Sequence, residues 1–187
     1  AGAEGFRGGR SGPRSRMGFV ISRYSRPAMS QIWSDGEKLR RWLAVELAEL
    51  NRNGLFTKES QPGVLAEGHS QRAYVTGFCS VGSAAALLDL SGRSDLVTVA
   101  HAPGEASQSS IPVTRQDGEV ATVLGSSEGP AGEDQLRDWS EEANDNLALL
   151  LAESWYVEVF DPVWGRNGAL LPAVHKALAG VEAGGLG

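Results

Sequence analysis

The sequence predicts an α+β fold, with a mixed, largely antiparallel sheet and helices packed against it. Segments with helical periodicity and short alternating segments rich in Val, Thr, Tyr and Phe both occur along the chain. The Asp-Gly pair at residues 117–118 predicts a hairpin between two of the strands. No G-x-G-x-x-G motif follows the first strand, so a doubly wound dinucleotide-binding fold is disfavoured.

The chain divides into three parts by composition. It has 187 residues, of which 41% are hydrophobic, enough for one core. Residues 1–18 are rich in Gly, Arg and Ser, which predicts a disordered tail. We expect residues 19–180 to form a single α+β domain and residues 181–187 to be a flexible C-terminus.

A long helix is expected to begin at Ser34, because Ser34 and Glu37 have the spacing of a capping box. The Asn53-Gly54 pair is typical of a left-handed C-terminal cap and predicts its end. The apolar residues between these signals recur at intervals of three and four and define one buried face: Leu39, Trp42, Leu43, Leu47 and Leu50.

The segments after this helix alternate between strand and helix patterns. A short apolar step at 55–57 comes first, and Pro62-Gly63 predicts a turn over 60–63. Alternation then predicts a strand from Gln71 to Cys79. The further elements expected are helices over 84–90, 133–154 and 169–179, strands over 96–100, 111–114, 120–124 and 156–160, and a flexible loop over 126–132.

Charge and composition limit the partners. Residues 1–26 hold six arginines and one glutamate, so the rest of the chain carries the negative charge behind the total of −6. Because Gly and Ser interrupt this basic tail, we expect it to be solvated and do not expect nucleic acid as a partner. No apolar run approaches the about 20 residues of a membrane span, and Cys79 has no second cysteine to pair with. A cytoplasmic protein without membrane attachment is expected.

Motifs for metal or nucleophilic chemistry do not occur. The three histidines belong to no H-E-x-x-H motif and the chain has no cysteine cluster, so no metal site is predicted. There is no G-x-S-x-G nucleophile elbow. The acidic residues between 134 and 145 have the pattern of the solvent-facing side of a helix.

Two hydroxyl side chains, Thr57 and Ser60, flank two polar residues immediately before Pro62, at the crossover from the first helix to the first strand. Unpaired backbone groups at such a crossover suit a small ligand with carboxylate, amine and hydroxyl groups. The alternative is that both hydroxyls bond their own backbone in the turn, and composition alone favours it.

Residues 21–48 read I-S-R-Y-S-R-P-A-M-S-Q-I-W followed by a helical W-L-A-V-E stretch. This segment resembles the N-terminus of adenylosuccinate lyases, and the resemblance implies that Arg23 and Tyr24 lie near a substrate phosphate. The catalytic histidines and the flexible loop of that family are missing here, so lyase activity is not expected.

A second resemblance covers roughly residues 39–180. The run N-R-N-G-L-F-T-K-E-S-Q-P, then Q-R-A-Y-V-T-G-F, resembles the C-terminal regulatory domain of eukaryotic methylenetetrahydrofolate reductase, which binds S-adenosylmethionine and S-adenosylhomocysteine. The family's Glu-Thr pair is replaced here by Leu39 and Arg40, and its glycine-rich loop is shorter. The resemblance implies ligand contacts at Thr57, Ser60 and Thr114, which should then converge on one cleft, with further ligand-binding candidates at Gln61, Arg72 and Tyr74.

The motifs S-Q-P-G, Q-R-A-Y-V-T-G-F and D-P-V-W-G-R-N also resemble a small domain family of streptomycetes, which suggests an actinobacterial protein but lends no activity. The sequence thus favours a small-molecule-binding domain for S-adenosylmethionine, S-adenosylhomocysteine or a related nucleoside. One alternative is a small enzyme acting on such a substrate, with Arg166, Asp161 or Arg72 taking part. The other is an interaction module or homodimer, with the acidic helix around Trp139 as its surface.

Overall fold

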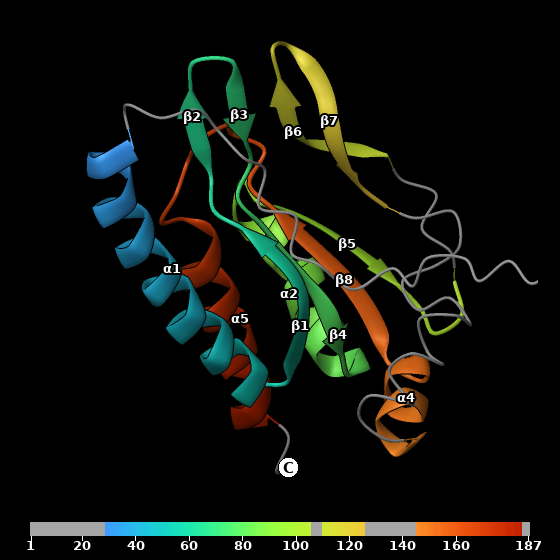
Figure 1. Cartoon of the computed structure of the whole chain (residues 1–187). Coiled ribbons are helices and arrows are strands. Elements are labelled where there is room, and N and C mark those ends of the chain that lie inside the picture. The colour runs from blue at the N-terminus through green and yellow to red at the C-terminus, as the bar shows by residue number, and fades with distance from the viewer. Residues whose placement is uncertain (1–28, 106–109, 126–144, 185–187) are drawn as a thin grey trace, which may run out of the picture.

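The computed structural model describes residues 29–105, 110–125 and 145–184, and these parts form two antiparallel sheets with packed helices (Figure 1). The predicted α+β class is therefore confirmed. The elements in chain order are α1 (Met29–Arg52), β1 (Leu55–Gln61), β2 (Val64–Ala66), β3 (His69–Gln71), β4 (Tyr74–Cys79), α2 (Val81–Arg93), β5 (Val97–His101), β6 (Ile111–Gln116), β7 (Glu119–Leu124), α4 (Asp145–Ala152), β8 (Trp155–Phe160) and α5 (Leu170–Gly184).

The first sheet has the strand order β1-β4-β8-β5, and the second has the order β2-β3-β6-β7. Each strand pair in the described part of the chain is antiparallel. β8, the last strand in sequence, lies in the interior of the first sheet between β4 and β5.

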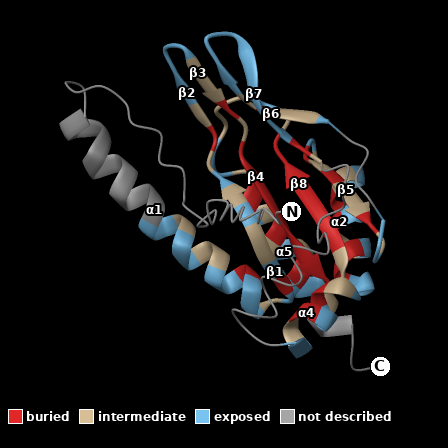
Figure 2. Cartoon of the chain, turned by 45° about the vertical axis from the view of Figure 1, so that its right-hand side comes forward, coloured by how far each residue is buried: buried red, intermediate tan, exposed pale blue. Residues whose placement is uncertain are grey.

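Helices α1, α2 and α5 cover one face of the first sheet, and the main core lies between them (Figure 2). Strand residues that alternate along β4 and β8 point into this core, as the period of two along a strand requires. Burial raises the pKa of the Cys79 thiol in this core to about 12. Side chains of the core without measurable exposure include Leu50, Leu55, Val75, Leu87, Val157, Val159, Val174 and Leu178.

The other face of the first sheet, here called the distal face, carries two smaller apolar clusters. At one end, Tyr74 and Phe160 pack against Val113 and Leu124 of the second sheet. At the other end, Phe78 and Tyr156 pack against Leu151 of α4. The second sheet and α4 therefore lie at opposite ends of this face (Figure 1).

The hairpin between β6 and β7 turns at Asp117 and Gly118, as the Asp-Gly pair predicts. Both residues have positive φ, 50° and 87°, which a type I′ turn requires. Apart from Leu124, the side chains of β7 are exposed, and the turn end of the hairpin projects away from the first sheet (Figure 2).

Residues 161–168, here called the junction loop, lead from the end of β8 to α5 and lie against the second sheet, where the Gly165 amide donates to the Gln71 carbonyl (2.9 Å). The Asn167 side chain accepts a hydrogen bond from the Gly63 amide (2.6 Å) and donates one to the Gly63 carbonyl (2.5 Å). Buried Asp161 accepts from the Val163 amide (2.9 Å) and from Nε of Arg166 (2.5 Å). The D-P-V-W-G-R-N motif thus holds the β1–β2 connection against the end of the main core.

Three sequence-based boundaries were wrong. α1 begins at Met29, so Ser34 lies inside the helix and does not cap it; no proline follows Pro27 before the end of this helix, so the earlier start is sterically allowed. β1 continues to Gln61, because pairing with β4 extends the strand through the expected turn at 60–63. The strand expected over 71–79 is split, since Gln71 belongs to the second sheet and Tyr74 to the first.

Several expectations fall outside the described residues. They are the tail over 1–18, the loop over 126–132, most of the helix over 133–154 including Trp139, and residues 185–187 of the C-terminus. Within the described part of the chain, no helix combines the length and apolarity that crossing a membrane requires.

Candidate functional site

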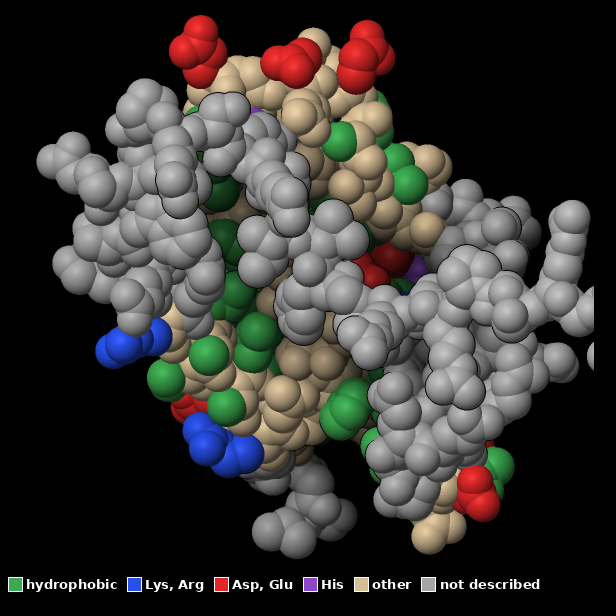
Figure 3. Space-filling view, viewed as in Figure 1, with side chains coloured by type: hydrophobic (Ala, Val, Ile, Leu, Met, Phe, Trp, Pro, Cys, Tyr) green, Lys and Arg blue, Asp and Glu red, His purple; other side chains and the backbone are tan. Residues whose placement is uncertain are grey.

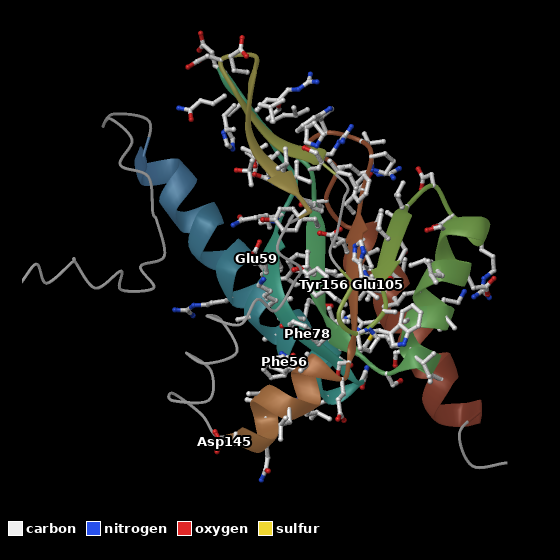
Figure 4. All side chains as sticks on the ribbon, turned by 90° about the vertical axis from the view of Figure 1, so that its right-hand side faces the viewer. Phe56, Glu59, Phe78, Glu105, Asp145 and Tyr156 are labelled. Atoms are coloured by element: carbon white, nitrogen blue, oxygen red, sulfur yellow. The ribbon has the colours of Figure 1, made fainter. Side chains whose placement is uncertain are left out.

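Polar and aromatic side chains form two rows across the distal face, because residues opposite each other in an antiparallel sheet point to the same side. One row runs from Glu59 through Thr76 to Glu158. The neighbouring row, which runs across all four strands of the first sheet, is Phe56, Phe78, Tyr156 and His101. Figure 4 shows Phe56, Glu59, Phe78 and Tyr156 along this part of the sheet.

An irregularity in β1 adds a cation to this face. The register with β4 shifts between Thr57 and Glu59, which leaves Lys58 as the extra residue of a β-bulge. The Lys58 ammonium lies 5.7 Å from the centre of the Tyr156 ring. Burial lowers the pKa of Lys58, and the nearby carboxylates of Glu59 and Glu158 oppose this effect.

Glu158 is the central carboxylate of the face, with only 1% of its surface exposed. Its Oε1 accepts a hydrogen bond from the Gly125 amide (2.9 Å), and its Oε2 lies 3.3 Å from Nε2 of His101. His101 is itself 8% exposed and stacks on Tyr156 with a centroid distance of 6.2 Å. Because a buried carboxylate is costly without such partners, this arrangement is a specific feature of the fold.

The phenols beside this carboxylate are held in the neutral form. Burial raises the pKa of Tyr156, and the negative charges of Glu158 and Glu59 raise it further. Burial also raises the pKa of Tyr74 to about 12, with a smaller effect from Glu59. Near neutral pH the site therefore presents phenol groups rather than phenolates.

We call the region around Glu158, His101, Tyr156, Glu59 and Lys58 the distal recess. It is bounded at one end by the cluster that joins the second sheet and at the other by α4. Figure 3 shows acidic and histidine side chains close together on this side of the molecule. The recess combines carboxylates, an imidazole, an ammonium and aromatic rings, the set needed to hold a polar ligand and to move protons.

The structure does not bring Thr57, Ser60 and Thr114 together. The amide of Thr57 donates to Oδ1 of Asn51 (2.8 Å), and its hydroxyl also contacts that side chain, which closes the corner between α1 and β1. Ser60 is paired with Val75, whose side chain is in the main core. Thr114 lies in the second sheet and donates to Oε1 of Gln71 (2.6 Å).

Gln61 and Tyr74 are neighbours in the β1–β4 ladder and line a small pocket with Trp42, Pro62 and Asn167. The centre of a water molecule has about 10 Å³ in which to move there. That is room for about one water, far less than a nucleoside needs.

Arg72 lies between β3 and β4, where the chain passes from one sheet to the other. Its Nη1 donates to the Pro112 carbonyl (2.9 Å), and its guanidinium stacks on Trp164. Burial lowers the pKa of Arg72, as does the positive charge of Arg115. Arg23 and Tyr24, the expected phosphate contacts, lie outside the described residues.

Sequence reasoning selected none of the five residues that define the distal recess. A signal was present in the strand Y-V-E-V-F, because Glu158 occupies the same face as Tyr156 and Phe160 in an otherwise apolar segment. A charged residue in the interior of a buried strand marks a functional candidate. Among the described residues, no group of three or more His, Cys, Asp or Glu side chains could hold a metal ion.

Fold and site together define an α+β domain with a buried polar cluster on the face of its first sheet opposite α1, α2 and α5. Residues 22–181 match the family described as "Domain of unknown function (DUF6919)", and the chain belongs to this family. No curated protein matches the chain.

Proposed function

We propose that this domain binds a small organic molecule with a cationic or amine group in the distal recess. The observation that carries the proposal is Glu158, a carboxylate with 1% exposure between His101 and the aromatic row. A carboxylate in such a position strongly attracts a positive group, because burial reduces the screening by water.

The aromatic rings support the same ligand class. Cations bind over the faces of Tyr and Phe rings within about 6 Å of the centroid. The contact of the Lys58 ammonium with the Tyr156 ring, 5.7 Å from its centroid, supports this ligand class. A ligand ammonium or sulfonium would interact with the same ring and with the Glu59 and Glu158 carboxylates.

S-adenosylmethionine, S-adenosylhomocysteine or a related nucleoside is the specific ligand we propose. The sequence resemblance supplies this candidate, and the charge of the recess supports it, since S-adenosylmethionine carries a sulfonium and an amino group. The proposed position differs from the one that the resemblance implies, because Thr57 bonds to Asn51 of α1 and Thr114 bonds to Gln71 of the second sheet.

An enzyme using the same recess is the second candidate. The pair formed by His101 Nε2 and Glu158 Oε2, 3.3 Å apart and beside a Tyr156 phenol with raised pKa, has the arrangement of a general acid and base. Turnover of a bound nucleoside by the wild type, lost in His101→Gln with binding retained, would favour the enzyme over a pure binder.

Titration calorimetry tests binding directly. We expect the wild type to bind S-adenosylmethionine about 2- to 30-fold more tightly than S-adenosylhomocysteine, because the cation interaction is worth about 0.5–2 kcal/mol. Glu158→Gln preserves the shape of the side chain and should weaken binding at least tenfold. Glu49→Gln removes the same charge from an exposed position on α1 and serves as the control.

The proposal is abandoned if neither S-adenosyl compound nor adenosine gives heat or a thermal shift at millimolar concentration. If Glu158→Gln and Glu49→Gln bind the ligand with equal affinity, the binding site lies outside the distal recess. The interaction-module alternative would then become the leading hypothesis.

A further inference from the structure

Two arginines from different strand segments lie around a single indole at the junction of the sheets. The Cζ atom of Arg72 lies 4.4 Å from the centroid of the Trp164 ring, and the Cζ atom of Arg115 lies 5.1 Å from it. Arg72 precedes β4, Arg115 is in β6, and Trp164 is in the junction loop. The fold therefore brings two positive groups and one indole together from three segments that are distant in sequence.

Neither guanidinium has a carboxylate partner in the described part of the chain. The polar contact of the Arg72 guanidinium there is the Nη1 bond to the Pro112 carbonyl, and its Nε is buried without a hydrogen-bond partner. The nearby carboxylate of Asp161 already accepts from the Val163 amide and from Nε of Arg166. Other arginines do have partners, such as Arg93 with Asp89.

Two like charges in one cluster repel each other, and an unpaired buried donor adds a further cost. Burial and the charge of Arg115 both lower the pKa of Arg72, which agrees with this geometry. An anion between the guanidiniums would relieve the repulsion. Guanidinium groups bind carboxylate and phosphate oxygens through paired N–H donors, and the Trp164 ring holds both arginines in place for this contact.

We infer that Arg72, Arg115 and Trp164 form a binding site for a small oxyanion, either a phosphate or a carboxylate of a metabolite. The inference does not depend on the distal recess, which attracts positive groups. The ligand of the arginine site is negatively charged, and the residues that bind it are not those of the distal recess. The domain thus has one site for a cation and a second site for an anion.

NMR titration of the full chain with inorganic phosphate tests this site, using the indole N–H resonance of Trp164 as the readout. Sodium chloride at matched ionic strength controls for screening. A parallel titration with acetate distinguishes a phosphate-preferring site from a carboxylate-preferring one. We expect a saturable shift of the Trp164 resonance with at least one of the two anions and none with chloride.

Two variants and one control localise the effect. Arg115→Gln changes an exposed side chain and should keep the fold, whereas Arg72→Lys keeps the charge but removes the planar fork. Each should weaken anion binding about tenfold or more, and Arg93→Gln on α2 should leave it unchanged. The inference is overturned if phosphate and acetate give no saturable shift, or if Arg115→Gln and Arg93→Gln bind the anion equally well.

Discussion

Replacing Asn167 by alanine tests how strongly the junction loop holds the molecule together. The substitution removes both hydrogen bonds to Gly63, at 2.6 and 2.5 Å. Each such bond contributes about 0.5–1.5 kcal/mol, so we expect the free energy of unfolding to fall by about 1–3 kcal/mol. For a domain of this size, that corresponds to a Tm about 2–12 °C lower.

Thermal unfolding followed by circular dichroism provides the assay for Asn167. Asn167→Asp keeps an acceptor for the Gly63 amide but loses the donor to the Gly63 carbonyl, so its Tm should lie between those of the wild type and Asn167→Ala. Asn146→Ala, at an exposed position of α4, is the control and should change the Tm by about 1–2 °C at most. If Asn167→Ala has the same Tm as this control, the junction loop does not stabilise the fold as described.

Two further predictions concern the first sheet. Gly77→Ala should destabilise the fold by about 1–3 kcal/mol in urea unfolding, because the added Cβ would collide with the Phe56 carbonyl oxygen. The control is Gly92→Ala on α2, whose Cβ meets no atom, so this variant should be neutral or stabilising. Equal stability of the two variants would contradict this prediction. Tyr74 has a folded-state pKa of about 12, above its ordinary value of 10.0, because burial disfavours the phenolate. The neutral phenol therefore contributes fully to the free energy of unfolding below pH 10, and this contribution should be lost progressively between pH 10 and 12. The loss amounts to about 2–3 kcal/mol, and Tyr74→Phe should flatten the fall in stability over this range; an unchanged alkaline profile would argue against the burial effect.

Periodicity and turn chemistry predicted most strands and helices because these signals are local. The Asp117-Gly118 hairpin is the clearest case, since its residue types determine the turn without any tertiary information. β1 was expected only as a short apolar step over 55–57, because Pro62-Gly63 predicted a turn over 60–63. In the structure β1 is an edge strand that continues to Gln61, and its pairing with β4 resumes after the bulge at Lys58.

The distal recess could not be predicted in the same way because it depends on strand order. His101 meets Glu158 because β5 pairs with β8, although α4 and both hairpin strands of the second sheet lie between them in sequence. The alternation around Glu158 indicates a polar residue on one face but not which residues oppose it. Resemblance selected the hydroxyls of Thr57 and Thr114, and the structure places these in separate sheets.

The position of β8 has a consequence for synthesis on the ribosome. Until β8 emerges, β4 can pair only with β1, and β5 has no neighbour in the first sheet. A growing chain, or a fragment that ends before residue 155, therefore exposes the strand edges of β4 and β5, which are templates for aggregation. His101 therefore lacks its Glu158 partner while the chain is being synthesised, and the recess forms only when β8 is inserted between β4 and β5.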